Sequence, residues 1–380
     1  MSTHSALTLQ AGPAAMRIIQ ERGLRPQDIR VLAGAAGGPK WLVLSGLDRM
    51  IFGSWFPDRT APLFLVGSSI GAWRFAALSR RQPLEALDRF EAAYTHQRYE
   101  SKPTAGEVSR ESQRIMDDFL DDDGIREILD HPFLRLNLFS VRCNGLLASD
   151  AKLPLAAGLA GAALANLCRR RLLSLFFQQT LFYDSRSVPP FQKGDGFSPR
   201  RVKLAGDNFR QALLASGSIP LVMNRVSDIP GAEKGAYRDG GIVDYHLDIP
   251  FGVKGDGLVL FPHYTDRIIP GWFDKRLTWR KPHPDHMAHV LMVSPSREFV
   301  ADLPFGKIPD RNDFWQFFGD DDGRIGYWQT VSRKSRQLAD ELAELVESGR
   351  IAERIRPFGD DGLSPGGFAG SGRAAAGRFN

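Results

Sequence analysis

The distribution of apolar and polar residues along the chain predicts buried strands that alternate with helices. Four consecutive apolar residues, Leu63 to Val66, predict a buried strand, and residues 134–143 alternate as a strand does. Apolar residues at helical spacing predict helices at 13–22, 83–98 and 107–120. The other predicted strands are 29–33, 202–205, 257–264 and 289–294, and the other predicted helices are 41–50, 208–215 and a charged helix from 331 onward. This alternation favours an α/β fold with a mostly parallel central sheet flanked by helices.

One segment is far more apolar than the rest. Residues 153–168 are almost wholly small and apolar, and three arginines follow at 169–171. A helix over this segment would be about 24 Å long, shorter than the roughly 30 Å hydrocarbon core of a bilayer. Two interpretations remain: a buried or lid helix, or a helix in the membrane interface with its arginines on lipid headgroups. In the second, residues 153–177 contact an anionic membrane surface peripherally.

Composition and charge narrow the class of protein. Of 380 residues, 43% are apolar and 24% charged, as is typical of a soluble protein with a sizeable core. The net charge of +5 is not gathered into one tract and lacks interleaved aromatic residues, so no nucleic-acid partner is expected. Two cysteines, Cys143 and Cys168, cannot form a disulfide framework, and residues 1–10 lack the pattern of a secretory signal. We therefore expect a cytoplasmic protein; its oligomeric state is left open.

The chain is expected to form a single hydrolase-sized domain over residues 1–355. Its motifs lie within about 28–260, and residues 300–355 form a helical extension. Residues 356–380 are rich in Gly, Ala and Arg without periodicity, which predicts a disordered tail. The acidic run 121–124 lacks the ligand spacing of a calcium loop and is interpreted as a turn and helix cap.

The predicted strand at 63–66 runs directly into the motif Gly-x-Ser-x-Gly. This order is typical of a nucleophile elbow, a tight turn between a buried strand and a helix. Gly67 and Gly71 allow the strand and the helix to approach closely, which places Ser69 on a strained apex. The N-terminus of the following helix supplies free backbone N–H groups and a positive dipole, both of which are useful where an oxyanion forms.

A second glycine-rich turn follows the predicted strand at 29–33. Residues 34–40 read Gly-Ala-Ala-Gly-Gly-Pro-Lys and precede a predicted helix, an arrangement that can cradle an anion. The anion is a phosphate or a developing oxyanion; the alternative is a tight turn between strand and helix without a ligand. Neither nucleotide-binding glycine motif is matched, which makes nucleotide binding the weaker use.

A third block completes a family pattern. Residues 215–220 read Ala-Ser-Gly-Ser-Ile-Pro, residues 237–241 read Tyr-Arg-Asp-Gly-Gly, and Asp-Ile-Pro follows at 248–250. Together with the glycine-rich turn and the elbow, in this order, the block resembles the patatin-like phospholipase family over about residues 28–260. The resemblance implies a three-layer α/β/α fold and a lipid acyl hydrolase with a serine–aspartate dyad.

The resemblance also implies roles for individual residues. Ser69 is the expected nucleophile and Asp239 the expected base, acting on a lipid or fatty-acyl ester without metal or cofactor. The expected oxyanion donors are the backbone N–H groups of Gly37, Gly38 and Ile70. Because an ordinary aspartate, with a pKa of about 3.9, is a poor base, we expect burial to raise the pKa of Asp239. The supporting residues are Gly34, Gly67, Gly71, Gly240, Gly241 and Lys40.

One departure from the family pattern leaves the register of the oxyanion turn open. The family usually has a basic residue shortly after the glycines of this turn. Alignment on the following helix puts Ala36 there, whereas alignment on the glycine pair puts Lys40 there. Lys40 would then steady the turn or an anionic headgroup; otherwise it is a surface lysine.

Three alternatives remain open at this stage. An α/β-hydrolase triad would join Ser69 and Asp239 to a histidine. The candidates for that histidine are His246, His263, His283, His286 and His289. Histidines 283, 286 and 289 with Asp285 also invite a metal site. A non-catalytic lipid-binding or scaffold protein on the same fold would tolerate loss of Ser69 or Asp239.

Overall fold

The computed structural model of the chain describes residues 5–56, 59–191 and 198–359. Five parallel strands form the centre of its sheet, in the order β10 (Val290–Pro295), β9 (Leu258–Pro262), β2 (Ile29–Gly34), β3 (Leu63–Ser68) and β4 (Leu134–Cys143). Nearly all of their residues are buried, as expected for parallel strands covered on both faces.

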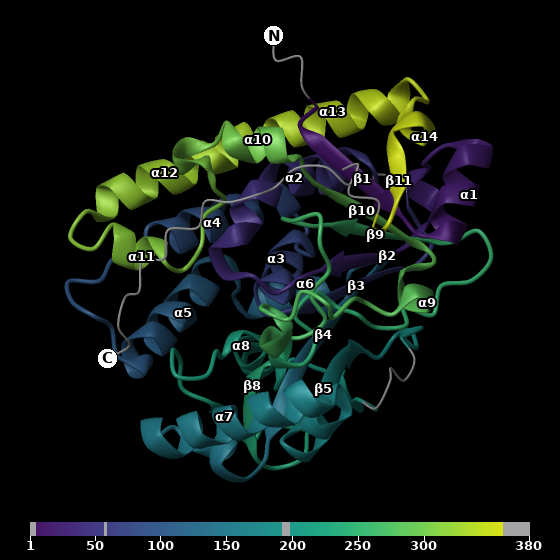
Figure 1. Cartoon of the computed structure of the whole chain (residues 1–380). Helices are drawn as coiled ribbons and strands as arrows, with labels where there is room; N and C mark the ends of the chain where they lie inside the picture. The colour runs from purple at the N-terminus through teal and green to yellow at the C-terminus, as the bar shows by residue number, and fades with distance from the viewer. Residues whose placement is uncertain (1–4, 57–58, 192–197, 360–380) are drawn as a thin grey trace.

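Strands of mixed direction extend this centre at both edges (Figure 1). Beyond β10, β1 (Leu7–Ala11) runs antiparallel, and β11 (Ile355–Pro357) pairs with β1. Beyond β4, β5 (Phe177–Asp184) runs antiparallel, and β6 (Arg200–Leu204) pairs with β5. The protein is therefore an α/β protein with a mostly parallel central sheet, as the sequence predicts.

Helices flank the sheet, and α12 and α13 run along one side of the molecule (Figure 1). Helix α3 packs against β2, β3 and β4, and α8 packs against β4. The longer helices are α1 (Pro13–Arg22), α2 (Ser45–Ser54), α3 (Ile70–Leu78), α4 (Pro83–Thr95), α5 (Ala105–Phe119), α6 (Asp122–Leu129), α7 (Lys152–Cys168), α8 (Phe209–Gly217), α12 (Asp321–Lys334) and α13 (Arg336–Glu347). The short ones are α9 (Pro284–Met287), α10 (Arg297–Ala301), α11 (Asp313–Gln316) and α14 (Ile351–Arg354).

A buried ion pair joins two of the helices behind the site. The guanidinium of Arg74 on α3 lies 2.7 Å from the carboxylate of Asp48 on α2, and both side chains are only 1% exposed. Nearby, the indole of Trp41 stacks on the ring of Phe90 with the ring centroids 4.9 Å apart. The buried positive charge of Arg74 thus has a partner of opposite sign in direct contact.

Several boundaries differ from the expectations. The predicted helix at 41–50 begins as a 3₁₀ turn, η2 (Gly38–Leu44), before α2 continues it, because Pro39 and a left-handed Gly38 open the segment.

The sequence pattern did not predict the strands β1 and β5. Residues 356 and 357, placed in the tail, belong to β11, and the rest of that prediction at 360–380 lies outside the described residues. Asp121 caps α6 by accepting a 2.7 Å bond from the N–H of Gly124.

Helix α7 packs one face on the protein and leaves the other open. Leu155, Leu159 and Ala162 are buried, whereas Leu153 is 85% and Leu164 66% exposed. The segment is therefore neither fully buried nor fully external. No helix of the described residues combines the length and the apolar character needed to cross a membrane.

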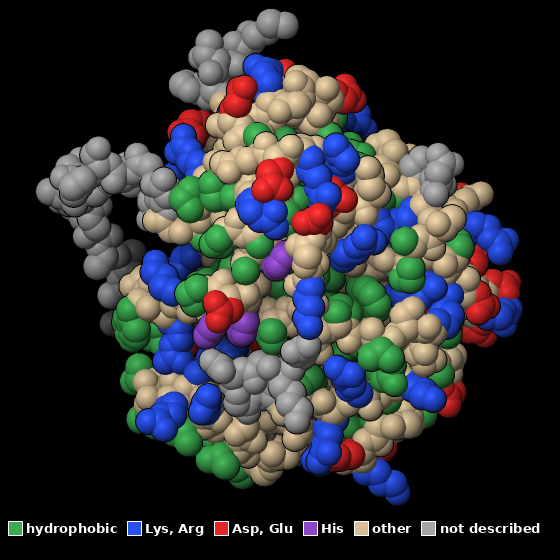
Figure 2. Space-filling view, turned by 90° about the vertical axis from the view of Figure 1, so that its right-hand side faces the viewer, with side chains coloured by type: hydrophobic (Ala, Val, Ile, Leu, Met, Phe, Trp, Pro, Cys, Tyr) green, Lys and Arg blue, Asp and Glu red, His purple; other side chains and the backbone are tan. Residues whose placement is uncertain are grey.

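Positive charge is dispersed over the molecule. Figure 2 shows lysine and arginine side chains spread over one face and interspersed with aspartate and glutamate. This distribution agrees with the mild net charge of +5.

Candidate active site

The strand register brings two distant segments together at the carboxyl end of β3. Strand β3 pairs with the first part of β4, up to Ser68 opposite Phe139. Strand β8 (Ala236–Asp239), which also pairs with the short β7 (Val226–Ser227), runs antiparallel along the second part of β4, with Asp239 opposite Ser140. Strand β5 pairs with the other edge of β4. Strands β3 and β8 therefore lie one after the other along the same edge of β4, and their carboxyl ends meet. Ser69 therefore lies next to Asp239.

The turn at Ser69 is strained and depends on its glycines. Ser69 has φ 54° and ψ −129°, in a region that residues with a side chain rarely adopt. A Cβ on Gly71 would lie 2.1 Å from the carbonyl oxygen of Gly34, and one on Gly67 would lie 2.5 Å from the nitrogen of Ala72. The close approach of β2, β3 and α3 thus requires glycine at these positions.

The side chains of Ser69 and Asp239 are directly hydrogen-bonded. The Ser69 hydroxyl donates to Oδ2 of Asp239 over 2.6 Å, and the N–H of Gly241 donates to Oδ1 over 2.7 Å. Both residues are buried. Burial raises the pKa of Asp239, an effect that the hydrogen bonds from Ser69 and Gly241 partly offset. The arrangement supplies a hydroxyl and a proton acceptor already in contact.

A second serine holds this arrangement in place. The hydroxyl of Ser216, near the end of α8, accepts a 3.0 Å bond from the N–H of Ser69 and donates a 2.7 Å bond to the carbonyl of Phe139. The carbonyl of Ser218 accepts from the N–H of Asp239 over 3.0 Å. The sequence block at 215–220 contained both serines, but nothing in the pattern indicated their hydrogen bonds.

Two residues that line the cavity of Ser69 have backbone N–H groups that are not used within a helix. Gly38 is the first residue of η2 and Ile70 the first of α3, so neither N–H has an acceptor within its helix. Both residues line the same cavity as Ser69. The carbonyl of Ala36 accepts a 2.6 Å bond from the hydroxyl of Tyr264, so the N–H of Gly37 in the same trans peptide points the opposite way.

Lys40 lies beside the turn and is partly buried. Its ammonium lies 5.0 Å from the centre of the Tyr264 ring, and burial lowers the pKa of Lys40. Ala36, the other candidate for the family's basic position, is buried. Lys40 is therefore not an ordinary surface lysine.

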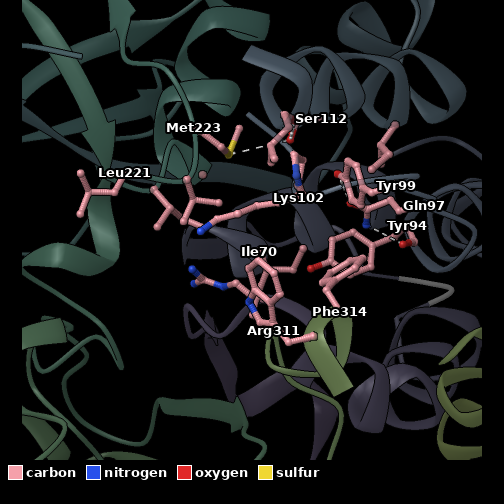
Figure 3. A pocket seen from close by; sticks show the side chains of 18 of the residues that line it. Ile70, Tyr94, Gln97, Tyr99, Lys102, Ser112, Leu221, Met223, Arg311 and Phe314 are labelled. Carbon is pink, nitrogen blue, oxygen red and sulfur yellow. Dashed lines mark hydrogen bonds between the residues drawn. The ribbon is translucent and has the colours of Figure 1, made fainter. Parts of the chain in front are cut away.

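An apolar cavity of about 370 Å³ opens onto Ser69. This volume is within the usual range of roughly 300–1,000 Å³ for small-molecule sites. Arg311 and Phe314 lie on one side of it, opposite Ser112 and Met223 on the other (Figure 3). Its apolar lining includes Ile70, Trp73, Val108, Ile115, Ile219 and Met223. The cavity suits a hydrocarbon chain better than a polar ligand.

Two further cations near the dyad were missed by sequence reasoning. Lys275 and Arg311 both lie close enough for their charges to favour the ionised form of Asp239. The ammonium of Lys275 lies 4.2 Å from the centre of the Tyr245 ring. No local pattern marks either residue, because each reaches the site only through the packing of a loop.

The histidines do not complete a triad in the described part of the chain. Nε2 of His246 lies 2.7 Å from the hydroxyl of Tyr264, and Nδ1 of His263 lies 2.7 Å from the carbonyl of Thr265. Burial lowers the pKa of His263 to about 3. None of the five candidate histidines is hydrogen-bonded to Ser69 or Asp239 there.

The candidate metal ligands also fail to converge. His286 lies 2.8 Å from Asp248, and Nδ1 of His289 lies 2.9 Å from the carbonyl of Gly257. Within the described ranges, no group of three or more histidine, cysteine or acidic side chains is placed to hold a metal ion.

Comparisons with known proteins add little to this geometry. Neither the protein-family models nor the curated proteins give a match to this chain. Among solved structures, VipD from Legionella pneumophila is similar, with a TM-score of 0.32 and 12% sequence identity. The similarity covers 69% of this chain and 54% of the VipD chain, so this chain spans about half the length of that protein. A similarity of this degree does not bear on the reaction.

Proposed function

We propose that the protein is a lipid acyl hydrolase that cleaves carboxylic esters through a Ser69–Asp239 dyad. The observation that carries this proposal is the 2.6 Å hydrogen bond between the two side chains, on a strained turn that opens onto an apolar cavity. Strain of this kind is typical of functional sites. The sequence resemblance to the patatin-like phospholipases supports the same assignment.

In the acylation step, the oxygen of Ser69 attacks the ester carbonyl as Asp239 takes its proton. The carbonyl oxygen becomes an oxyanion, for which the N–H groups of Gly37, Gly38 and Ile70 are the donors. The tetrahedral species collapses by breaking the bond to the alcohol. Asp239 returns its proton to that oxygen, and an acyl-Ser69 ester remains.

In the second step, water resolves the acyl-enzyme. Asp239 takes a proton from the water, whose oxygen attacks the acyl carbon, and the bond to Ser69 breaks. The proton returns to the oxygen of Ser69 and the free fatty acid leaves. A raised pKa suits Asp239 to both directions of transfer, because the ideal general base has a pKa near the working pH.

The acyl chain would occupy the cavity beside Ser69. Its walls are mostly aromatic and aliphatic, with a few polar and charged side chains such as Arg311, and exposed Leu221, Trp315 and Phe318 also line it. Exposed apolar side chains of this kind favour substrates delivered from an apolar surface.

Fatty-acid release from phospholipid, lysophospholipid and glyceride substrates tests the proposal. Ser69→Ala and Asp239→Asn should each lower turnover by roughly 10³-fold or more. Ser68→Ala is the matched control: Ser68 precedes the nucleophile and is buried, with no hydrogen bond from its hydroxyl to a described residue. Retained turnover in both dyad variants would overturn the dyad, whereas no fatty-acid release by the wild type would leave a lipid-binding role without catalysis.

We further propose that the exposed face of α7 rests on an anionic membrane surface. Leu164 and Leu167 are exposed on the helix, and Leu175 is exposed on the following turn η4 (Arg170–Leu175). Arg169 follows the helix directly and is exposed, and arginine beside an apolar face suits anionic headgroups. Arg170 instead donates a hydrogen bond to the carbonyl of Val243 and pairs with Asp244.

A further inference from the structure

Three cationic side chains from separate segments lie close to one another, and two of them, Lys275 and Arg311, lie close to Asp239. Lys40 belongs to η2, Lys275 follows the turn η6 (Trp272–Asp274), and Arg311 precedes α11. They act on each other electrostatically: the charges of Arg311 and Lys40 both oppose the positive charge of Lys275. Loss of hydration, together with these charges, lowers the pKa of Lys275 to about 7.

Aromatic rings and the oxyanion turn fix the positions of the three groups. The ammonium of Lys40 lies over Tyr264 and that of Lys275 over Tyr245. Nε of Arg311 lies 3.2 Å from the place that a Cβ on Gly38 would occupy. The guanidinium therefore reaches the glycine-rich turn, whose Gly38 lines the same cavity as Ser69.

None of the three cations has a counter-ion in contact among the residues that the structure describes. No carboxylate oxygen there lies within 4.0 Å of their nitrogens, and their side chains make no hydrogen bond there. Asp310, whose charge acts on Lys40, already accepts the N–H of Asn312 over 2.7 Å and lies 3.5 Å from Lys307.

The contrast with Arg74 is informative. Arg74 and Asp48 form a contact ion pair of 2.7 Å, which is the usual solution for a charge withdrawn from water. A cluster of three like charges without such partners is unfavourable in the free protein. A bound anion would relieve that repulsion and would gain charge-assisted hydrogen bonds.

The position of the cluster indicates which part of a substrate it would meet. Arg311 lines the cavity that contains Ser69, and it also lines a small recess with Asp239, Tyr245 and Trp272. In the proposed reaction, Asp239 returns its proton to the departing alcohol. A substrate group that lies on the Asp239 side of Ser69 therefore belongs to the alcohol part of the ester.

We propose that Lys40, Lys275 and Arg311 bind an anionic group, a phosphate or a carboxylate, on the alcohol part of the ester. The protein then selects anionic amphiphiles over neutral glycerides. This inference rests on the proposed hydrolase function and specifies its substrate class.

Kinetics with matched esters test the selectivity. The substrates share an oleoyl chain and are presented in the same uncharged micelles: 1-oleoylglycerol, 1-oleoylglycerol 3-phosphate and the oleoyl ester of lactic acid. The two anionic esters distinguish phosphate from carboxylate recognition. We expect Lys275→Met and Arg311→Gln each to raise KM for at least one anionic ester about tenfold, without change for 1-oleoylglycerol. Lys254→Met is the charge-matched control, since Lys254 is exposed and precedes β9 at the opposite end of the sheet.

The cations could instead serve only to keep Asp239 ionised. In that case both variants would lower kcat equally for the neutral and the anionic esters and leave every KM unchanged, which would overturn the proposal. Equal KM values for neutral and anionic esters in the wild type would also overturn it.

A binding measurement separates this inference from the proposed function. Ser69→Ala protein is titrated calorimetrically with hexadecyl phosphate and with the neutral hexadecyl glycerol ether. Tighter binding of the phosphate, lost in the Ser69→Ala/Lys275→Met double variant, supports the anion site even if no ester is hydrolysed. Equal binding of the two ligands contradicts it.

Discussion

The N–H of Ser69 donates a 3.0 Å hydrogen bond to the hydroxyl of Ser216, 147 positions further along the chain. The hydroxyl of Ser216 in turn donates a hydrogen bond to the carbonyl of Phe139 in β4. The strained turn is thus tied to α8 and to the central sheet. The geometry of the dyad depends on a residue that does not itself touch a substrate.

Replacing Ser216 with alanine should therefore affect both stability and rate. The buried N–H of Ser69 and the carbonyl of Phe139 each lose a partner, which costs about 1–3 kcal/mol of unfolding free energy per unsatisfied group. We expect kcat to fall more than KM changes, because the cavity itself is untouched. Ser218→Ala is the control, since among the described residues its hydroxyl bonds only to the carbonyl of Leu214 within α8. Chemical denaturation and steady-state kinetics measure the two effects; an unchanged kcat would contradict the positioning role.

Asp239 predicts a distinctive pH dependence. Its pKa is raised by burial, and the base must be ionised, so kcat/KM should fall on the acid side at a higher pH than an ordinary aspartate would give. A pH profile with a neutral ester measures this. An acid limb at or below about pH 3.9, the ordinary aspartate value, would contradict it.

The same shift has a consequence for stability. A carboxyl group with a raised pKa in the folded state costs stability as pH rises through that pKa. Asp239→Asn removes this cost, so the variant should have a higher Tm than the wild type at about pH 8 and no advantage below about pH 3.9. A thermal-unfolding series over pH tests the sign. Loss of stability at about pH 8 would mean that the ionised carboxylate is well compensated.

Gly71 tests the close approach of α3 and β2. In Gly71→Ala the new Cβ would lie 2.1 Å from the carbonyl oxygen of Gly34, so the helix must move. We expect loss of activity and a lower Tm. Gly326→Ala is the matched control, because Gly326 is also helical but has no atom within 4 Å of its Cβ position. That variant should gain up to about 1 kcal/mol from helix propensity.

The exposed face of α7 predicts a measurable lipid interaction. Leu164→Glu with Leu167→Glu should reduce co-sedimentation with liposomes that contain anionic lipid, because apolar burial is lost and negative charge is added. Phe305→Glu, at an exposed aromatic residue of the 3₁₀ turn η7 (Pro304–Gly306), is the control. If the folded α7 variant co-sediments with the liposomes as the wild type does, α7 does not contact the membrane.

Much of the scaffold around the site could be predicted from sequence, because the signals there are local. The apolar run at 63–66 and the glycines that flank Ser69 define β3 and its turn without tertiary information. The strand at 134–143 was predicted with the bounds that β4 has. Strand β1 was not predicted, although its apolar and polar residues alternate over five positions.

The polar surroundings of the dyad could not be predicted, because they depend on packing. Ser216 acts through hydrogen bonds to β3 and β4 that no spacing encodes. Lys275 and Arg311 come from the last third of the chain, where the sequence offered no motif. Asp239 was found only because Asp-Gly-Gly resembles a family block.

The most direct test of the dyad is the mass of the intact protein during turnover of a p-nitrophenyl fatty-acyl ester. We predict a transient mass increase of one acyl group, mapped by peptide analysis to Ser69, absent in Ser69→Ala and retained in Ser68→Ala. Fatty-acid release by the Ser69→Ala protein at the wild-type rate, or an acyl group on another residue, would contradict the account.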